Sequence, residues 1–236
     1  EVYKSSPFGV VSSFLIGISH SAVFSLIAVY ATSMNFSILE VSIVTFLFAI
    51  SGAISQWPIG KLSDVLDRRI VIIYTTFGAA LFCFLAIISS GQMYMPAGLA
   101  TSKIFFYICI MCFSFCSLPM FALIFAHTND FIPKEKFVAA GAGLQFVFGL
   151  GAICGPFMCS LFMEFLGENG FFIFLIIFHS FIGLFGIYRM QIRESGDNPD
   201  SQFAPMPQTI TPAGIELNPS TEPIDEPNNL NEFKKI

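Results

Sequence analysis

Six long apolar segments constrain this chain more than any other feature of its sequence. Each is uncharged over its core and is long enough to cross a bilayer as a helix, which takes roughly 20 residues. The runs are continuously apolar rather than alternating, so they do not fit lipid-facing strands. The sequence therefore predicts an all-α, multi-pass transmembrane helical bundle with spans at 8–31, 37–59, 70–90, 104–126, 137–163 and 171–188.

The composition also favours a membrane over water as the solvent. The chain is 55% hydrophobic and 11% charged, whereas soluble domains carry about 25% charged residues. Its 30 Phe would be hard to bury in one soluble core of this size. The sequence has no basic patch, so we expect membrane lipid rather than nucleic acid as a partner.

The basic residues of the connecting segments predict an orientation. Lys103 is alone on one side of the predicted membrane. The other side carries Lys4, Lys61, Arg68, Arg69, Lys134, Lys136, Arg189 and Arg193. Because Lys and Arg accumulate in cytoplasmic loops, we expect both termini to be cytoplasmic, in a plasma or bacterial inner membrane.

The character of the chain changes at about residue 194. The segment from there to the end is acidic and rich in Pro, and it buries too little apolar surface to offset its ordering entropy. We therefore predict a six-span transmembrane domain over 1–193 and a disordered cytoplasmic tail over 194–236. The first residue is Glu1 and no signal-peptide layout follows, which is typical of a fragment that begins inside a loop.

Two short stretches repeat in spans two and five. Gly52-Ala53-Ile54 lies in span two, and Gly151-Ala152-Ile153 lies in span five. These two spans cross the membrane in opposite directions. The pattern fits an inverted repeat of three plus three spans, which many transporters use.

The charged stretch between spans two and three carries a family resemblance. It reads GKLSDVLDRR from Gly60 to Arg69 and resembles the loop signature of the major facilitator superfamily, roughly G-x-L-[AS]-D-R-x-G-R-R. The matching residues are Gly60, Leu62, Ser63, Asp64, Arg68 and Arg69. Val65 replaces the usual Arg, and Asp67 replaces the usual Gly of the tight turn.

Span five carries a second resemblance. Its GLGAICGPFMCS stretch is similar to a helix motif of that family, with Gly151, Gly155 and Pro156 in place, and Pro156 should bend the helix. Phrases such as SQWPIGKLSDVLDRR and FIGLFGIYRM resemble the C-terminal half of the uncharacterised YcaD-like branch. The resemblance implies half of a twelve-span fold.

The resemblance also implies a role for the charged stretch. In the family, an Asp at the position of Asp64 faces the N-terminal end of span five, where a helix carries about half a positive charge. This implies a conformational latch that closes the cytoplasmic side, made of Gly60, Asp64, Arg68 and Arg69. The alternative is that the basic residues are topology anchors only.

Polar residues in the spans are candidates for a substrate or proton pathway. By the family's arrangement, spans one, two, four and five line the cavity, which selects His20, Gln56, Tyr107 and Gln145. His20 lies near the midplane, where ionisable residues are functional candidates, and imidazole titrates near neutral pH. The alternative for each is a hydrogen bond between helices. His179, in span six, is expected to be structural.

The resemblance as a whole implies a secondary active transporter. It would move a small-molecule substrate by alternating access, as proton-coupled efflux, together with a missing N-terminal six-span half. The alternative is a non-transporting receptor or scaffold that acts through its tail. The sequence has no Walker, Ser/His/Asp or metal-ligand pattern, so we expect no enzyme activity, cofactor or metal.

Overall fold

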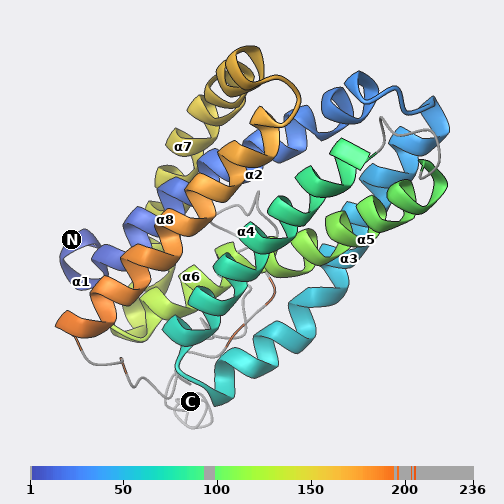
Figure 1. Cartoon of the computed structure of the whole chain (residues 1–236). Coiled ribbons are helices and arrows are strands. Elements are labelled where there is room, and N and C mark those ends of the chain that lie inside the picture. The colour runs from blue at the N-terminus through green and yellow to red at the C-terminus, as the bar shows by residue number, and fades with distance from the viewer. Residues whose placement is uncertain (1, 93–98, 194–195, 197–202, 204, 206–236) are drawn as a thin grey trace, which may run out of the picture.

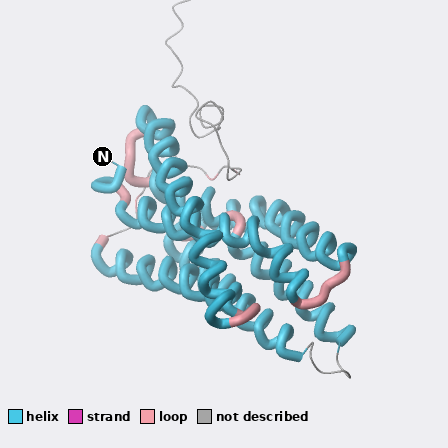
Figure 2. Tube along the Cα trace, turned by 90° about the horizontal axis from the view of Figure 1, so that it is seen from above, coloured by secondary structure: helices cyan, strands magenta, loops and turns pink. Residues whose placement is uncertain are grey.

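The computed structural model describes residues 2–92, 99–193, 196, 203 and 205, and every regular element within them is helical (Figure 2). The elements are α1 (Val2–Ser5), α2 (Pro7–Ser33), α3 (Ile38–Val65), α4 (Arg68–Gln92), α5 (Leu99–Ser117), α6 (Met120–Asn129), the 3-10 turn η1 (Lys134–Lys136), α7 (Phe137–Leu166) and α8 (Gly170–Ile192). The predicted all-α fold is confirmed. The predicted disorder of 194–236 lies outside the described residues, apart from three positions.

The predicted spans are also confirmed. Six helical stretches are long and apolar enough to cross a membrane, and each coincides with one predicted span. Local capping sets where several begin. Ser6 accepts a hydrogen bond from the Gly9 amide at 3.2 Å at the start of α2. Ser37 and Glu40 form a capping box at the start of α3, which satisfies amides that the first turn of a helix leaves without partners.

Helix α3 is longer than predicted. It continues past residue 59 to Val65 and ends where Leu66 takes an extended conformation. No helix breaker follows Gly60, and the Ser63 hydroxyl donates to the Gly60 carbonyl at 2.7 Å within the helix. Gly60 and Asp64 therefore lie on the last turns of a helix and not in a loop.

The fourth span is broken near its middle, which the sequence analysis did not predict. Helix α5 ends at Ser117, and α6 begins at Met120 after Pro119. Proline has no amide N–H and its ring crowds the preceding turn, so it interrupts the helical hydrogen bonds. The helical pattern resumes where the Leu123 amide donates to the Pro119 carbonyl at 3.0 Å.

The six spans form two related sets of three, α2–α4 and α5–α8 with α5 and α6 as one span, as the predicted inverted repeat requires. In this repeat α2 corresponds to α5 with α6, α3 to α7, and α4 to α8. The contact of α3 with α5 thus corresponds to that of α7 with α2, and the contact of α4 with α5 to that of α8 with α2. Figure 1 shows the result: α3 and α7 lie at opposite flanks, with the other helices between them. At one end of the core, Tyr30 lies 4.8–5.9 Å from the rings of Phe106, Phe171 and Phe172.

The two flanking helices are much less buried than the rest. Only 28% of the most apolar stretch of α3 and 22% of that of α7 are buried, against 44–67% in the other four spans. Large side chains such as Ile54 and Trp57 on α3, and Ile153 and Phe157 on α7, are exposed.

Candidate functional site

We call the charged end of the bundle the end that carries α1, the α3–α4 turn, the α6–α7 connection and the last turn of α8. The turn from α3 to α4 consists of Leu66 and Asp67 alone. The Asp67 carboxylate accepts the Arg69 amide at 2.9 Å and so caps α4, the usual role of Asp at a helix start. Among the described residues only Asn35 and Gly167 have positive φ, so this turn needs no glycine at 67.

Asp67 also pairs with the Arg69 side chain. The Arg69 Nη2 and Nε atoms lie 2.7 and 3.2 Å from Asp67 Oδ2. Partial burial by itself raises the pKa of the Asp67 carboxyl, but the hydrogen bonds and charge of Arg69 outweigh burial and hold that pKa below its ordinary value. Asp67 is therefore ionised at neutral pH and fixes Arg69 at the start of α4.

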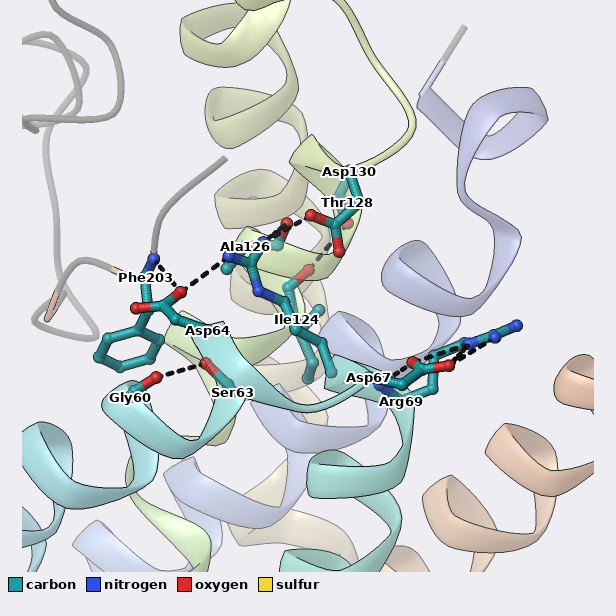
Figure 3. A network of polar contacts seen from close by, with 11 residues as sticks. Gly60, Ser63, Asp64, Asp67, Arg69, Ile124, Ala126, Thr128, Asp130 and Phe203 are labelled. Carbon is teal, nitrogen blue, oxygen red and sulfur yellow. Dashed lines mark hydrogen bonds and ion pairs between the residues drawn. The ribbon is translucent and has the colours of Figure 1, made fainter. Parts of the chain in front are cut away.

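Arg68 joins three helices at the charged end through Asp64, Ala126 and Asp130. Figure 3 labels these three partners. Its Nη2 donates to Asp64 on α3 at 2.9 Å, and its Nη1 donates to Asp130 after α6 at 2.6 Å. The same Nη1 donates to the Ala126 carbonyl at 3.0 Å. The Arg68 side chain is 8% exposed, against 12% for Asp130 and 38% for Asp64. Arg68 thus has one carboxylate partner that is nearly buried and one that solvent or another protein surface can reach.

Asp64 does not occupy the place that the sequence predicts. It bonds Arg68 and the Phe203 amide, at 2.9 Å each, rather than the first turn of α7, which begins after Lys136 without a side-chain cap. The reason is that Arg68, four positions along the chain, holds the carboxylate on the α3–α4 side and is itself bonded to the Ala126 carbonyl of α6. Capping of α7 within this chain is therefore corrected, whereas the latch itself stays a prediction.

Arg69 connects the turn to the last helix. Its Nη1 donates to the Arg193 carbonyl at 2.6 Å, and Arg193 Nη1 donates to the Ser5 carbonyl at 2.5 Å. The Arg193 guanidinium also lies 4.1 Å from the ring centre of Phe131. These contacts bring the start of the described chain, the α3–α4 turn and the end of α8 to the same end of the bundle.

Phe203 contacts both Gly60 and Asp64, which the sequence analysis did not predict. Its ring packs directly on Gly60: a Cβ added at Gly60 would lie 2.1 Å from Phe203 Cδ1. Figure 3 shows this ring below the hydrogen bond that the Phe203 backbone amide donates to Asp64. A side chain at position 60 would displace this ring, so the contact between Gly60 and Phe203 depends on glycine. The available signal was one of only two aromatic residues, Phe203 and Phe233, in a segment rich in polar residues and Pro.

The residues of the predicted helix-bend motif pack α7 against α2. A Cβ added at Gly151 would lie 2.2 Å from the Phe14 carbonyl oxygen, and one at Gly155 would lie 2.2 Å from that of Ile18. Small residues let two helix backbones approach in this way. Helix α7 continues through Pro156 to Leu166, and the bend stays a prediction.

The four pathway candidates do not gather at one place. His20 is buried, and its Nε2 lies 3.1 Å from both the carbonyl and the hydroxyl oxygen of Ser117. Gln56 and Gln145 are half-buried on the flanking helices. Tyr107 is half-buried near the opposite end, 6.2 Å from the Phe36 ring. Their roles in a pathway stay predictions.

Metal ligands do not cluster in the part of the chain that the structure describes. No group of three or more His, Cys, Asp or Glu side chains there is placed to hold a metal ion.

Comparison with known proteins gives matches at the level of a family. Residues 9–223 match the family model described as Major Facilitator Superfamily. The uncharacterized MFS-type transporter YE1530 of Yersinia enterocolitica is 23% identical over 201 residues, which cover 85% of this chain and 47% of that protein. The uncharacterized MFS-type transporter YfkF of Bacillus subtilis is 27% identical over 183 residues, covering 74% and 43%. The chain thus spans about half the length of these relatives. No solved structure matches.

Proposed function

The chain belongs to the major facilitator superfamily, and we propose that it is one six-span half of a secondary transporter that moves a small-molecule substrate by alternating access. The second half is then its main partner. The chain spans 47% and 43% of the two relatives described above, which supports a whole protein of about twice this length. We assign this chain to the C-terminal half of such a protein, and to the YcaD-like branch that its sequence motifs resemble.

The low burial of both flanking helices carries this proposal. Most of α3 and α7 lies unburied, on opposite flanks of one bundle (Figure 1). A second six-span half that contacts α3 and α7 covers both flanks at once and leaves a path between the two halves. In transporters built from repeats, the substrate site lies at such an interface, near the bilayer midplane.

We propose that the charged end faces the cytoplasm of a plasma or bacterial inner membrane. Eight basic residues belong to the connections and chain ends on this side of the predicted membrane. Lys103 lies at the other end, where it pairs with Glu40 at 2.6 Å. This distribution follows the positive-inside rule.

The charged end is then the latch of the transport cycle. Arg68 ties α3 and α4 of one repeat to α6 of the other, through Asp64 and Asp130. Asp64 is the more exposed partner and is the one that a second half can reach. Its contact with that half closes the cytoplasmic side and favours the outward-open state. Opening requires loss of this contact, while the Arg68–Asp130 pair stays within the bundle.

We further propose that transport is outward and coupled to protons, and a flux experiment tests this. The full-length protein is reconstituted in liposomes with an imposed pH gradient, and uptake of a library of labelled small molecules is measured. At least one compound should accumulate saturably, and collapse of the gradient with a protonophore should abolish accumulation. Saturable flux that ignores the gradient would contradict proton coupling. Normal insertion with no flux of any compound would favour the receptor or scaffold alternative.

A further inference from the structure

Two of the chain's three histidines are joined by one serine inside the bundle. His179 Nε2 on α8 lies 2.9 Å from the Ser117 hydroxyl oxygen at the end of α5, and His20 Nε2 on α2 lies 3.1 Å from the same oxygen. His179 Nδ1 lies 2.9 Å from the Leu175 carbonyl and 3.3 Å from the Ser19 hydroxyl. All four polar side chains are at most 1% exposed, so this is a buried network that links three helices.

The partners of each atom fix the direction of these hydrogen bonds. The Leu175 carbonyl can only accept, so the neutral His179 ring carries its proton on Nδ1. Its Nε2 must then accept from the Ser117 hydroxyl. His20 Nε2 faces the Ser117 carbonyl, which also only accepts, so His20 carries its proton on Nε2. The result is a one-way chain from His20 through Ser117 to His179.

Ser117 lies at the break in the fourth span. It is the last residue of α5, two positions before Pro119, and His20 donates to its carbonyl. Discontinuous membrane helices are where transporters commonly place coupling-ion sites, near the bilayer midplane. The two histidines lie near the middle of α2 and α8, so the network combines a helix break with titratable groups at membrane depth.

The groups that face the pair are mostly apolar. The Phe148 ring of α7 lies 6.3 Å from the His20 ring, and the Phe113 ring of α5 lies 5.5 Å from the His179 ring. The Cys116 thiol of α5 faces α4, where a Cβ added at Gly78 would lie 3.1 Å from the sulfur. The charged residues of the surrounding helices lie toward helix ends: Glu40, Lys61, Asp64, Arg68, Arg69, Lys103, Glu164 and Arg189.

We propose that His20, Ser117 and His179 form one proton-binding site. A proton that binds His20 Nδ1 moves charge through the chain as follows. The His20 Nε2–H bond breaks and its proton joins the Ser117 oxygen, while the original Ser117 proton leaves and forms a new N–H bond at His179 Nε2. The Ser117 hydroxyl then donates to His20 Nε2, and the bond from His20 to the Ser117 carbonyl is lost. The polarity of the chain is reversed, and the added charge lies on His179.

Proton binding at this site opposes the packing seen here. A charged imidazole among phenyl rings, with no nearby carboxylate in the described helices, is unfavourable. A bound proton therefore favours a conformation that admits water or a counter-charge at the α5–α6 break. Because α2 belongs to one repeat and α5 and α8 to the other, separation of the two imidazoles accompanies a movement between repeats, and protonation shifts the population of states.

Nitrogen-15 NMR of the whole chain in lipid nanodiscs, with labelled histidine rings, tests the site. At neutral pH we expect the His20 proton on Nε2 and the His179 proton on Nδ1. On acidification, His20 should lose its Nε2 proton and His179 should gain one at a single shared midpoint. Either ring titrating without the other, or unfolding before any ring titrates, would overturn the proposal. The third histidine, His127, lies at the charged end with its ring centre 5.1 Å from that of Phe8. Its NMR signals are identified by their absence in the His127→Gln variant.

Variants of Ser117 separate the relay from a structural role. Ser117→Ala removes the hydroxyl but keeps the backbone carbonyl, so His20 should keep its Nε2 proton while the shared midpoint is lost. Ser117→Thr keeps a hydroxyl and should restore the shared midpoint. A shared midpoint in Ser117→Ala would refute the relay.

The use of this site in transport rests on the proposed function, but proton binding by the pair does not. Gradient-driven flux with independent ring titrations would support the proposed transporter and refute the shared proton site. A coupled titration in a protein that shows no flux of any compound would support the shared proton site and refute the proposed function.

Discussion

Arg68 holds two carboxylates in different environments, and their removal should have unequal costs. The Asp130 pair has a 2.6 Å contact and a side chain only 12% exposed, so Asp130→Asn should lower the free energy of unfolding by about 1.5–3 kcal/mol, the range for charged hydrogen bonds. The loss stays below the about 3–5 kcal/mol of a buried charge left without a partner, because Asp64 remains. Asp64 is 38% exposed, so Asp64→Asn should cost less than about 1 kcal/mol.

The assay is unfolding of the purified chain in mixed micelles by SDS titration, followed by circular dichroism. Glu164→Gln is the matched control, since Glu164 is exposed near the other end of α7. Both Asn variants keep the shape of the side chain, so the comparison isolates charge. An Asp64→Asn cost equal to or above that of Asp130→Asn would refute the assignment of Asp130 as the main partner of Arg68. So would an Asp130→Asn variant that matches the control.

Further predictions concern packing, the tail and acidity. Gly155→Ala should lower the unfolding free energy by about 1–3 kcal/mol, because its methyl meets the α2 backbone, whereas Gly149→Ala, with nothing within 4 Å, should cost nothing in the same titration. Gly60→Ala should displace Phe203 and speed chymotrypsin cleavage after it; an unchanged rate would contradict the contact. The pKa of Asp67 is depressed, so its stabilisation is complete above the ordinary value of 3.8 and is lost as pH falls through the lower folded-state pKa. Asp67→Asn should therefore unfold with a weaker pH dependence in that acid range.

The spans could be predicted from the sequence because each is decided locally. A long uncharged apolar run in lipid must satisfy its own backbone, and a helix does so within one segment. The repeat of Gly52-Ala53-Ile54 in Gly151-Ala152-Ile153 also carried information. In the structure both stretches lie on the flanking helices, and both Ile side chains are exposed.

The candidate site was less predictable because its contacts join distant parts of the chain. Arg68 and Asp130 are 62 positions apart, as are Ser117 and His179, and no local pattern pairs them. His179 was interpreted as structural because the family's arrangement leaves span six out of the cavity lining. The end of α3 was placed too early because the charges of the motif were read as a loop, although a helix terminus accommodates them equally well.

The accessibility of the flanking helices tests the central claim most directly. Spin labels are attached through Ile54→Cys on α3, Ile153→Cys on α7 and Phe181→Cys on α8, three exposed positions, in full-length protein whose native Cys are replaced. Accessibility to oxygen, which dissolves in lipid, is measured by electron paramagnetic resonance in membranes. If a second half covers α3 and α7, the labels at 54 and 153 should be markedly less accessible to oxygen than the label at 181. Equal oxygen accessibility at all three positions would mean that lipid covers both flanks, and the two-half transporter would be contradicted.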